Sequence, residues 1–214
     1  DYNQCIKMEH NGLTLPNVFT SKYDKATIEF WIRPQSLVDW NQSAGPGWGT
    51  FMFHANANGT FTAGWDISDR LNATGVLTAG RWTHIALVVD GNKMTAYVNG
   101  SQKGTVTSKS YSGIGGFGDL VFSSNGTRND QHAFYDEIRI WKKARTAAEI
   151  KADYKQQYAT GLLPSQLIAY YRGDLIEQDG NHLLRDLTSN GHHGTFANAN
   201  FSLNSGYAQT LKYA

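Results

Sequence analysis

The feature that most constrains this chain is an alternation of apolar and polar residues with a period of two. In ATIEFWIRP, residues Ile28, Phe30 and Ile32 fall on one face of an extended strand, while Trp31 and Arg33 fall on the other. The same alternation returns in other segments, which are separated by tight polar turns: GTFMFHA (49–55), TFTAGWDI (60–67), RWTHIALVVD (81–90), KMTAYVNG (93–100), DLVFSS (119–124) and AFYDEIRIW (133–141). Many short strands joined by turns predict antiparallel sheets that bury one face each.

One segment departs from this period and indicates a helix near residues 146–158. Thr146 and Glu149 form a capping-box pattern, and Ile150, Tyr154 and Tyr158 repeat at four-residue spacing. Gly161 and Pro164 are expected to end the helix. Strands with a single late helix favour an all-β, two-sheet antiparallel sandwich over any alternation of strands and parallel crossovers.

Charge and composition exclude several classes of partner. The formal net charge of the 214 residues is +1, and no long basic run occurs, so nucleic acid is not an expected partner. No apolar run is long enough to span a bilayer, so this segment is not expected to insert into a membrane. Cys5 is the only cysteine, which rules out an intrachain disulfide and favours a buried thiol.

Three segments carry a resemblance to a known family. ATIEFWIRP, GRWTHIALVVDGNKMTAYVNGSQKG and FYDEIRIWKKARTAAEIKADY occur in that order and resemble the laminin-G-like jelly roll of the concanavalin A-like lectin and glucanase superfamily. The resemblance implies a concanavalin A-like jelly roll over residues 1–160, in which the concave face and the rim loops often bind carbohydrate. It does not by itself fix a function, because this fold hosts lectins, adhesive modules, lyases and glycosidases.

Residues 161–214 are expected to form a C-terminal appendage. The stretch LIAYYRGDLIEQDGNHLLRDLTSNGHHGTF resembles a segment that usually opens such a domain, although here it follows the predicted helix. It is interpreted either as an edge strand supplied in an altered chain order or as the start of a second, partial repeat. Packing on the same sandwich is favoured, since too few residues remain for another core.

The acidic residues do not suggest a glycosidase. Hydrolysis of a glycosidic bond needs two carboxyl groups a few ångströms apart. The only acidic pair on a strand is Asp136–Glu137, and adjacent strand residues point to opposite faces. We therefore expect Asp136 to bind backbone donors, Glu137 to be exposed, and the domain not to be an enzyme.

Metal binding is left open by the sequence. His182, His192 and His193 lack the spacing of a zinc site, and the resemblance explains the paired histidines as part of a turn. Pentraxins, which are relatives with this sandwich, hold calcium in the loop that matches SSNGTRNDQHAFYDE, and this would place Asn125, Asp130 and Gln131 as candidate ligands. Calcium prefers several carboxylates and only Asp130 supplies one, so no cofactor is certain and a structural calcium remains an alternative.

Aromatic and polar residues in the predicted loops are the candidate ligand-binding groups. Sugar rings need a flat apolar surface and a few fixed polar partners. The candidates lie in predicted rim loops 39–50, 54–66 and 111–132: Trp40, Trp48, Trp65, Tyr111, Asn125, Arg128 and Asp130. Each loop tryptophan could instead anchor its loop to the sheet edge. Trp40 is the expected anchor and Trp48 the expected platform, while Trp31, Trp82 and Trp141 are assigned to the scaffold.

These observations predict a non-catalytic, lectin-like carbohydrate-binding module whose partner is a glycan or polysaccharide. The resemblance further implies a secreted or cell-surface protein, such as those of bacterial glycan-utilisation systems. A protein-interaction or adhesion domain without a glycan site is the alternative, and a polysaccharide-cleaving enzyme of the same fold is a weaker one. The sequence does not indicate the oligomeric state.

Overall fold

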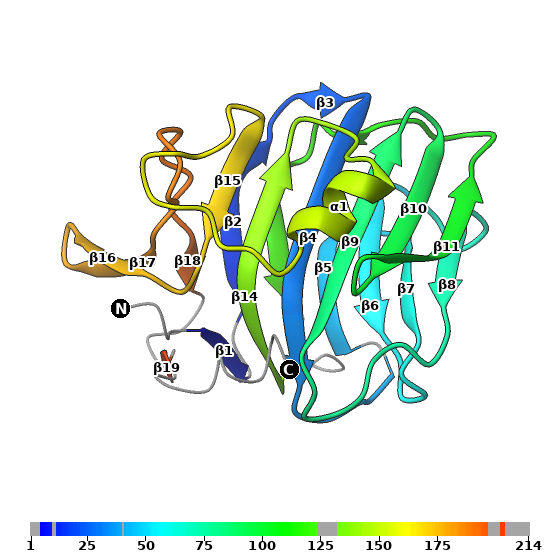
Figure 1. Cartoon of the computed structure of the whole chain (residues 1–214), viewed down its shortest axis with the longest axis horizontal. Coiled ribbons are helices and arrows are strands. Elements are labelled where there is room, and N and C mark those ends of the chain that lie inside the picture. Colours follow the sequence, from blue (N-terminus) through cyan, green and yellow to red (C-terminus); the bar gives the residue numbers. More distant parts are fainter. Residues whose placement is uncertain (1–4, 10–11, 40, 124–131, 197–201, 204–214) are drawn as a thin grey trace.

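Two antiparallel sheets pack face to face in the computed structural model, which describes residues 5–9, 12–39, 41–123, 132–196 and 202–203 (Figure 1). Sheet A has the order β11-β10-β9-β4-β14-β1-β19, and β15 also pairs with β14; sheet B has the order β18-β2-β13-β5-β6-β7-β8. This arrangement is the predicted all-β, two-sheet antiparallel sandwich.

The strands of sheet A are β1 (Ile6–Glu9), β4 (Lys25–Pro34), β9 (Thr83–Asp90), β10 (Lys93–Val98), β11 (Ser101–Thr107), β14 (His132–Trp141), β15 (Leu167–Tyr171) and β19 (Ser202–Leu203). Those of sheet B are β2 (Leu13–Phe19), β5 (Asn41–Gly47), β6 (Phe51–Ala55), β7 (Phe61–Gly64), β8 (Arg70–Ala73), β13 (Gly118–Ser123) and β18 (Thr195–Phe196). Two small pairs complete the set: β3 (Lys22–Tyr23) with β12 (Ile114–Gly115), and β16 (Leu175–Gln178) with β17 (Asn181–Leu184).

The main core lies between the two sheets and uses the apolar positions of the alternating segments. Ile28, Phe30 and Ile32 are all at most 1% exposed and belong to one core cluster. Phe30 of sheet A stacks on Phe53 of sheet B with 5.2 Å between ring centroids. The predicted hairpins are also present, as β6–β7 and β9–β10. The period-two pattern therefore predicted both the strands and the face that each one buries.

The one helix within the described residues, α1 (Ala147–Asp153), lies across the outer face of sheet A (Figure 1). The capping box is formed as predicted: Glu149 N–H donates to Thr146 Oγ1, and Thr146 N–H donates to Glu149 Oε2. The helix is shorter than the predicted 146–158. Its end is set by tertiary contacts, because the Tyr154 carbonyl accepts a hydrogen bond from the Trp31 indole at 3.0 Å instead of continuing the helical ladder.

A buried cluster of charges lies on this outer face of sheet A. Glu29 is 0% exposed, and its Oε1 accepts from Trp141 Nε1 and from Arg145 Nη1, both at 2.7 Å. Arg139 Nη1 is 3.7 Å from the same oxygen. Glu29 therefore joins β4, β14 and the segment that begins α1 through one carboxylate.

The prediction that Glu137 is exposed is wrong, since its exposed fraction is 1%. A bulge interrupts the pairing between Asp136 and Arg139, and Glu137 adopts a φ of 53° there. Asp136 Oδ1 accepts from Glu137 N–H at 2.7 Å, as expected for a side chain that binds backbone donors. Glu137 Oε2 in turn accepts from Arg139 Nη2 at 2.6 Å and from the Tyr170 hydroxyl at 2.7 Å.

Residues beyond 160 contribute strands to both sheets. β15 pairs with β14, β19 pairs with β1, and β18 pairs with β2. The β16–β17 hairpin projects from one side of the sandwich (Figure 1). Cys5 is buried and forms no disulfide, as expected for the only cysteine in the sequence. No helix in the described part of the chain is long and apolar enough to cross a membrane.

Replacing Glu29 by Gln should lower the free energy of unfolding by about 3–5 kcal/mol, because Arg139 and Arg145 would keep their buried charges and lose their shared partner. Replacing Lys25 by Gln is the control: it breaks an exposed ion pair with Asp90 and should cost less than about 1 kcal/mol. Urea unfolding of both variants measures the difference. Equal losses would contradict a central role for Glu29.

Candidate functional site

The outer face of sheet B carries two rows of side chains across β6, β7 and β8. The inward positions of these strands are core residues such as Phe53, Phe61 and Leu71, so the intervening positions face outward. The register places His54, Thr62 and Asn72 side by side in one row, and Met52, Gly64 and Arg70 in the next. These six residues are called the outer-face grid.

Hydrogen bonds fix the first row of the grid. Asn56, which follows β6, donates from Nδ2 to Thr62 Oγ1 at 3.0 Å, and Thr62 Oγ1 donates to Asn72 Oδ1 at 2.8 Å. Thr62 is 2% exposed, whereas Asn72 and Arg70 on β8 are exposed. The grid is therefore ordered at its buried end and open at the edge of the sheet.

Trp48 lies against the grid rather than in a free loop. Its ring is half-buried and meets the His54 ring edge to face, with 5.8 Å between centroids. The stretch 39–50 was expected to be a rim loop, and that expectation is wrong for Asn41–Gly47, which form β5 between β6 and β13. Gly45 and Gly47 have φ values of 113° and 123° and permit an irregular register, so the alternation that marks a regular strand is missing.

His54 is neutral over most of the pH range. Burial is the main cause that lowers its pKa from 6.5 to about 4, and the nearby charge of Arg70 lowers it further. The Asn56 side chain and Asp39 act in the opposite direction. The His54 side chain is also only 2% exposed, so it belongs to the buried end of the row.

Trp65 is not a platform, which corrects the prediction that it contributes to a binding surface. It is 2% exposed and belongs to the main core cluster. Its indole N–H donates to the Gly113 carbonyl at 2.8 Å, and its own carbonyl accepts from Gly49 N–H at 2.7 Å. Trp65 therefore anchors two neighbouring connections, which is the alternative role considered for loop tryptophans.

Tyr111 lies in one of the connections that Trp65 anchors. Its ring is half-buried against the core, and its hydroxyl is 3.5 Å from Asp66 Oδ2. Trp40, Asn125, Arg128 and Asp130, together with Gln131, lie outside the described residues. The scaffold assignment of Trp31, Trp82 and Trp141 is confirmed by exposed fractions of 3%, 8% and 4%.

The described side chains offer recognition chemistry rather than acid–base chemistry on this face. None of the outward positions of β6, β7 and β8 is a carboxylate, while Glu29 and Glu137 are sealed on the outer face of the other sheet. Within the part of the chain that the structure describes, no group of three or more His, Cys, Asp or Glu side chains is placed to hold a metal ion.

Four of the grid residues that carry polar groups were missed by sequence reasoning: His54, Thr62, Arg70 and Asn72. A signal for them existed, because the alternation that placed Phe51 and Phe53 inside also placed His54 outside. Their juxtaposition depends on which strands pair and in which register, and a single sequence does not state that.

Comparison with known families gives a match over most of the chain. The model of the concanavalin A-like lectin/glucanases superfamily matches residues 7–151. Human pappalysin-1 is 28% identical over 106 residues, which are 46% of this chain and 6% of that protein. The chain thus spans only a small part of that relative.

Several solved structures share the fold. A candidate carbohydrate-binding protein from Bacteroides ovatus superposes with a TM-score of 0.76 at 18% identity, over 95% of this chain and 60% of that one. The pentraxin of Limulus polyphemus superposes with a TM-score of 0.53 at 15% identity, over 71% of this chain and 82% of that one. Domain 4 of the Geobacillus stearothermophilus arabinanase AbnA was solved with arabinotriose. It superposes with a TM-score of 0.52 at 18% identity, over 66% of this chain and 71% of that one. At these identities the likeness concerns the fold alone.

The pKa of His54 predicts how stability depends on pH. Above pH 6.5 the imidazole is neutral in both states, but between pH 6.5 and about 4 the unfolded chain binds a proton that the folded protein excludes. Stability should therefore fall by up to about 1.4 kcal/mol per pH unit on acidification, and His54→Gln should remove this part of the slope. The free energy of unfolding of the wild-type protein and of His54→Gln, determined at several pH values, measures this slope. An equal loss of stability on acidification in the two proteins would contradict a lowered pKa of His54.

Proposed function

This chain belongs to the concanavalin A-like lectin/glucanases superfamily, and we propose that it is a non-catalytic carbohydrate-binding module. The ligand is a glycan or polysaccharide bound on the outer face of sheet B, over the grid and Trp48. The setting that we propose is a secreted or cell-surface protein, as in bacterial glycan utilisation.

One observation carries the proposal: the half-buried Trp48 ring stands beside an ordered polar row, which is buried at His54 and reaches solvent at Asn72. The C–H faces of a sugar pack on an aromatic ring, while its hydroxyls exchange hydrogen bonds with fixed polar groups. The hydrogen bonds from Asn56 to Thr62 and from Thr62 to Asn72 hold the row in place before a ligand arrives. Such order lowers the entropy lost on binding.

Binding without cleavage is favoured by the position of the carboxylates. A glycosidase needs one protonated and one ionised carboxyl group on either side of the scissile bond. Glu29 and Glu137 are at most 1% exposed and both are within ion-pair distance of Arg139, so a polysaccharide on the protein surface does not reach them.

A glycan array tests the proposal, run once with calcium and once with a chelator. We expect binding to a defined set of glycans, and loss of binding with the chelator would support a structural calcium near Asn125, Asp130 and Gln131. Failure of the folded protein to bind any glycan under both conditions would overturn the proposal in favour of a protein-interaction domain. Hydrolysis of a polysaccharide panel would contradict the non-catalytic assignment.

Replacing Trp48 by Ala should weaken glycan binding by roughly 10- to 100-fold, because an aromatic contact with its buried area contributes about 1.4–2.8 kcal/mol. Phe196→Ala is the matched control, since this ring is also half-buried but lies on β18, at the opposite edge of sheet B. Titration calorimetry measures both affinities, and circular dichroism verifies the folds. Equal losses in the two variants would argue against a platform at Trp48.

A further inference from the structure

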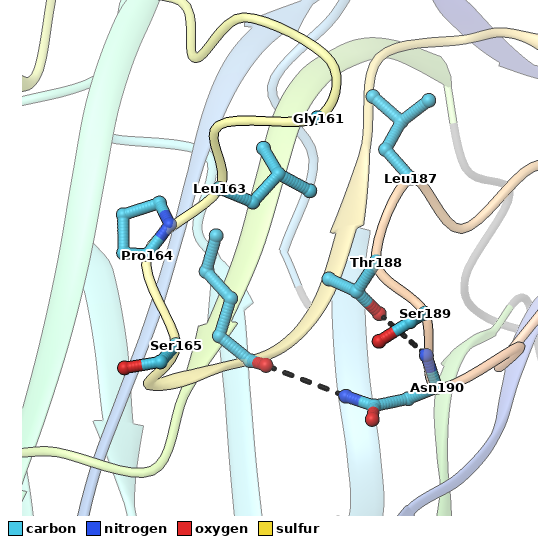
Figure 2. Close-up of a pocket in the computed structure, with 9 residues that line it drawn as sticks. Gly161, Leu163, Pro164, Ser165, Leu187, Thr188, Ser189 and Asn190 are labelled. Carbon is cyan, nitrogen blue, oxygen red and sulfur yellow. Dashed lines mark hydrogen bonds between the residues drawn. The ribbon is translucent and has the colours of Figure 1, made fainter.

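Two neighbouring cavities lie along the segment that connects α1 to β15, far in the sequence from the outer-face grid. The first has a volume of about 420 Å³ and lies between residues 161–167 and the turn at residues 187–190 (Figure 2). The second has a volume of about 450 Å³ and adjoins α1. Pro164 and Ser165 line both cavities, which therefore adjoin one another and are together called the seam site.

The turn that forms one wall of the seam site is held rigidly. Asp186 is 2% exposed, and its Oδ1 accepts from Tyr170 N–H and Thr188 N–H, each at 3.0 Å. Its Oδ2 accepts from the Thr188 hydroxyl at 2.8 Å and from His192 N–H at 3.0 Å. A carboxylate with four donors fixes this wall before any ligand binds.

Asn190 ties the same turn to β15 and keeps one polar atom available. Its Nδ2 donates to the Ile168 carbonyl at 2.8 Å. The same Nδ2 lies 3.4 Å from the Leu167 carbonyl, the contact drawn in Figure 2. The amide is thereby oriented, and Oδ1 remains as an acceptor. Ser165 and Ser189 are exposed at the mouth and add hydroxyl groups that both donate and accept.

The first cavity has the composition of a site for a neutral, hydroxylated ligand. None of the residues that line it is charged. Half-buried Leu163, Pro164 and Leu187 supply apolar surface between the polar groups (Figure 2). A charged ligand would find no ion-pair partner among these lining residues. A molecule with C–H faces and hydroxyls could pack on the apolar side chains and form hydrogen bonds with the polar ones.

The second cavity adds the partly exposed ring of Tyr158, which packs on the buried Trp141. Trp141 and Tyr158 line it, with 5.8 Å between their ring centroids, and Tyr158 is half-exposed. The four charged residues on its walls are already paired with one another, Lys143 with Glu149 and Arg145 with Asp153. These internal pairs leave the second cavity without a strong preference for either sign of charge.

We propose that the seam site is a second ligand site, distinct from the outer-face grid, which binds a short neutral oligosaccharide. One sugar unit would occupy the cavity of Thr188, Ser189 and Asn190, and the next would extend past Pro164 and Ser165 towards Tyr158. The joint volume of the two cavities is within the range of small-ligand sites. The seam site adjoins β14 and β15 of sheet A, so the two sites occupy different sheets.

An NMR titration of the isotope-labelled protein tests this assignment. The probes are arabinotriose, xylotriose, cellotriose and maltotriose. We expect at least one probe to shift the backbone amide signals of Ser189, Asn190 and Gly191 in a saturable way. Ser165→Trp, which fills the lip shared by both cavities, should raise the apparent Kd at these amides by at least tenfold. Thr78→Trp, an added ring at an exposed residue between β8 and β9, should leave it unchanged.

The outcomes separate this site from the proposed function. Trp48→Ala should weaken the binding reported by β6–β8 by roughly 10- to 100-fold and leave the seam shifts in place. Ser165→Trp should weaken binding at the seam and leave the shifts on β6–β8 in place. The seam site is overturned if no probe shifts its amides, or if the shifts persist in Ser165→Trp. It is also overturned if charged glycans or peptides shift these amides and the neutral probes do not, even when the outer face binds glycans.

Discussion

The Glu29 carboxylate is the interaction on which the arrangement of sheet A depends. It lies at the centre of the sheet on β4, and it gathers Trp141 and Arg145, with Arg139 near, at one buried oxygen. Because a buried charge without partners is costly, any arrangement that moves β14 or the start of α1 away from β4 is strongly disfavoured. The helix and the segment after it are thus held on the outer face of sheet A, where Glu29 and Glu137 are buried.

The two proposed ligand sites lie on different sheets of this sandwich. Among the described residues no helix covers the outer face of sheet B, where Trp48 lies beside the ordered polar groups of the grid. The seam site arises where the segment leaving α1 passes the turn held by Asp186. The seam site depends on how the segment after α1 is held against β14 and β15, whereas the grid depends on the register of β6, β7 and β8.

The sequence predicted the scaffold well and the site poorly, for different physical reasons. Burial and the capping box are local signals, so Phe30, Trp31 and the start of α1 were predicted correctly. Trp65 was predicted wrongly because a tryptophan among turn residues has the same local pattern whether its ring faces solvent or the core. Its burial follows from the contact with Gly113, which is 48 residues away.

The sequence by itself determined which residues alternate, and therefore the strands, the inward faces and the sandwich class, because a period of two requires only neighbouring residues. The tertiary structure alone decided that β5 is a strand, that Glu137 is buried beside Arg139, and that His54, Thr62 and Asn72 form one row. These features depend on strand order, register and a bulge, which arise from contacts between residues distant in the chain. The chemistry of both proposed sites lies in such contacts.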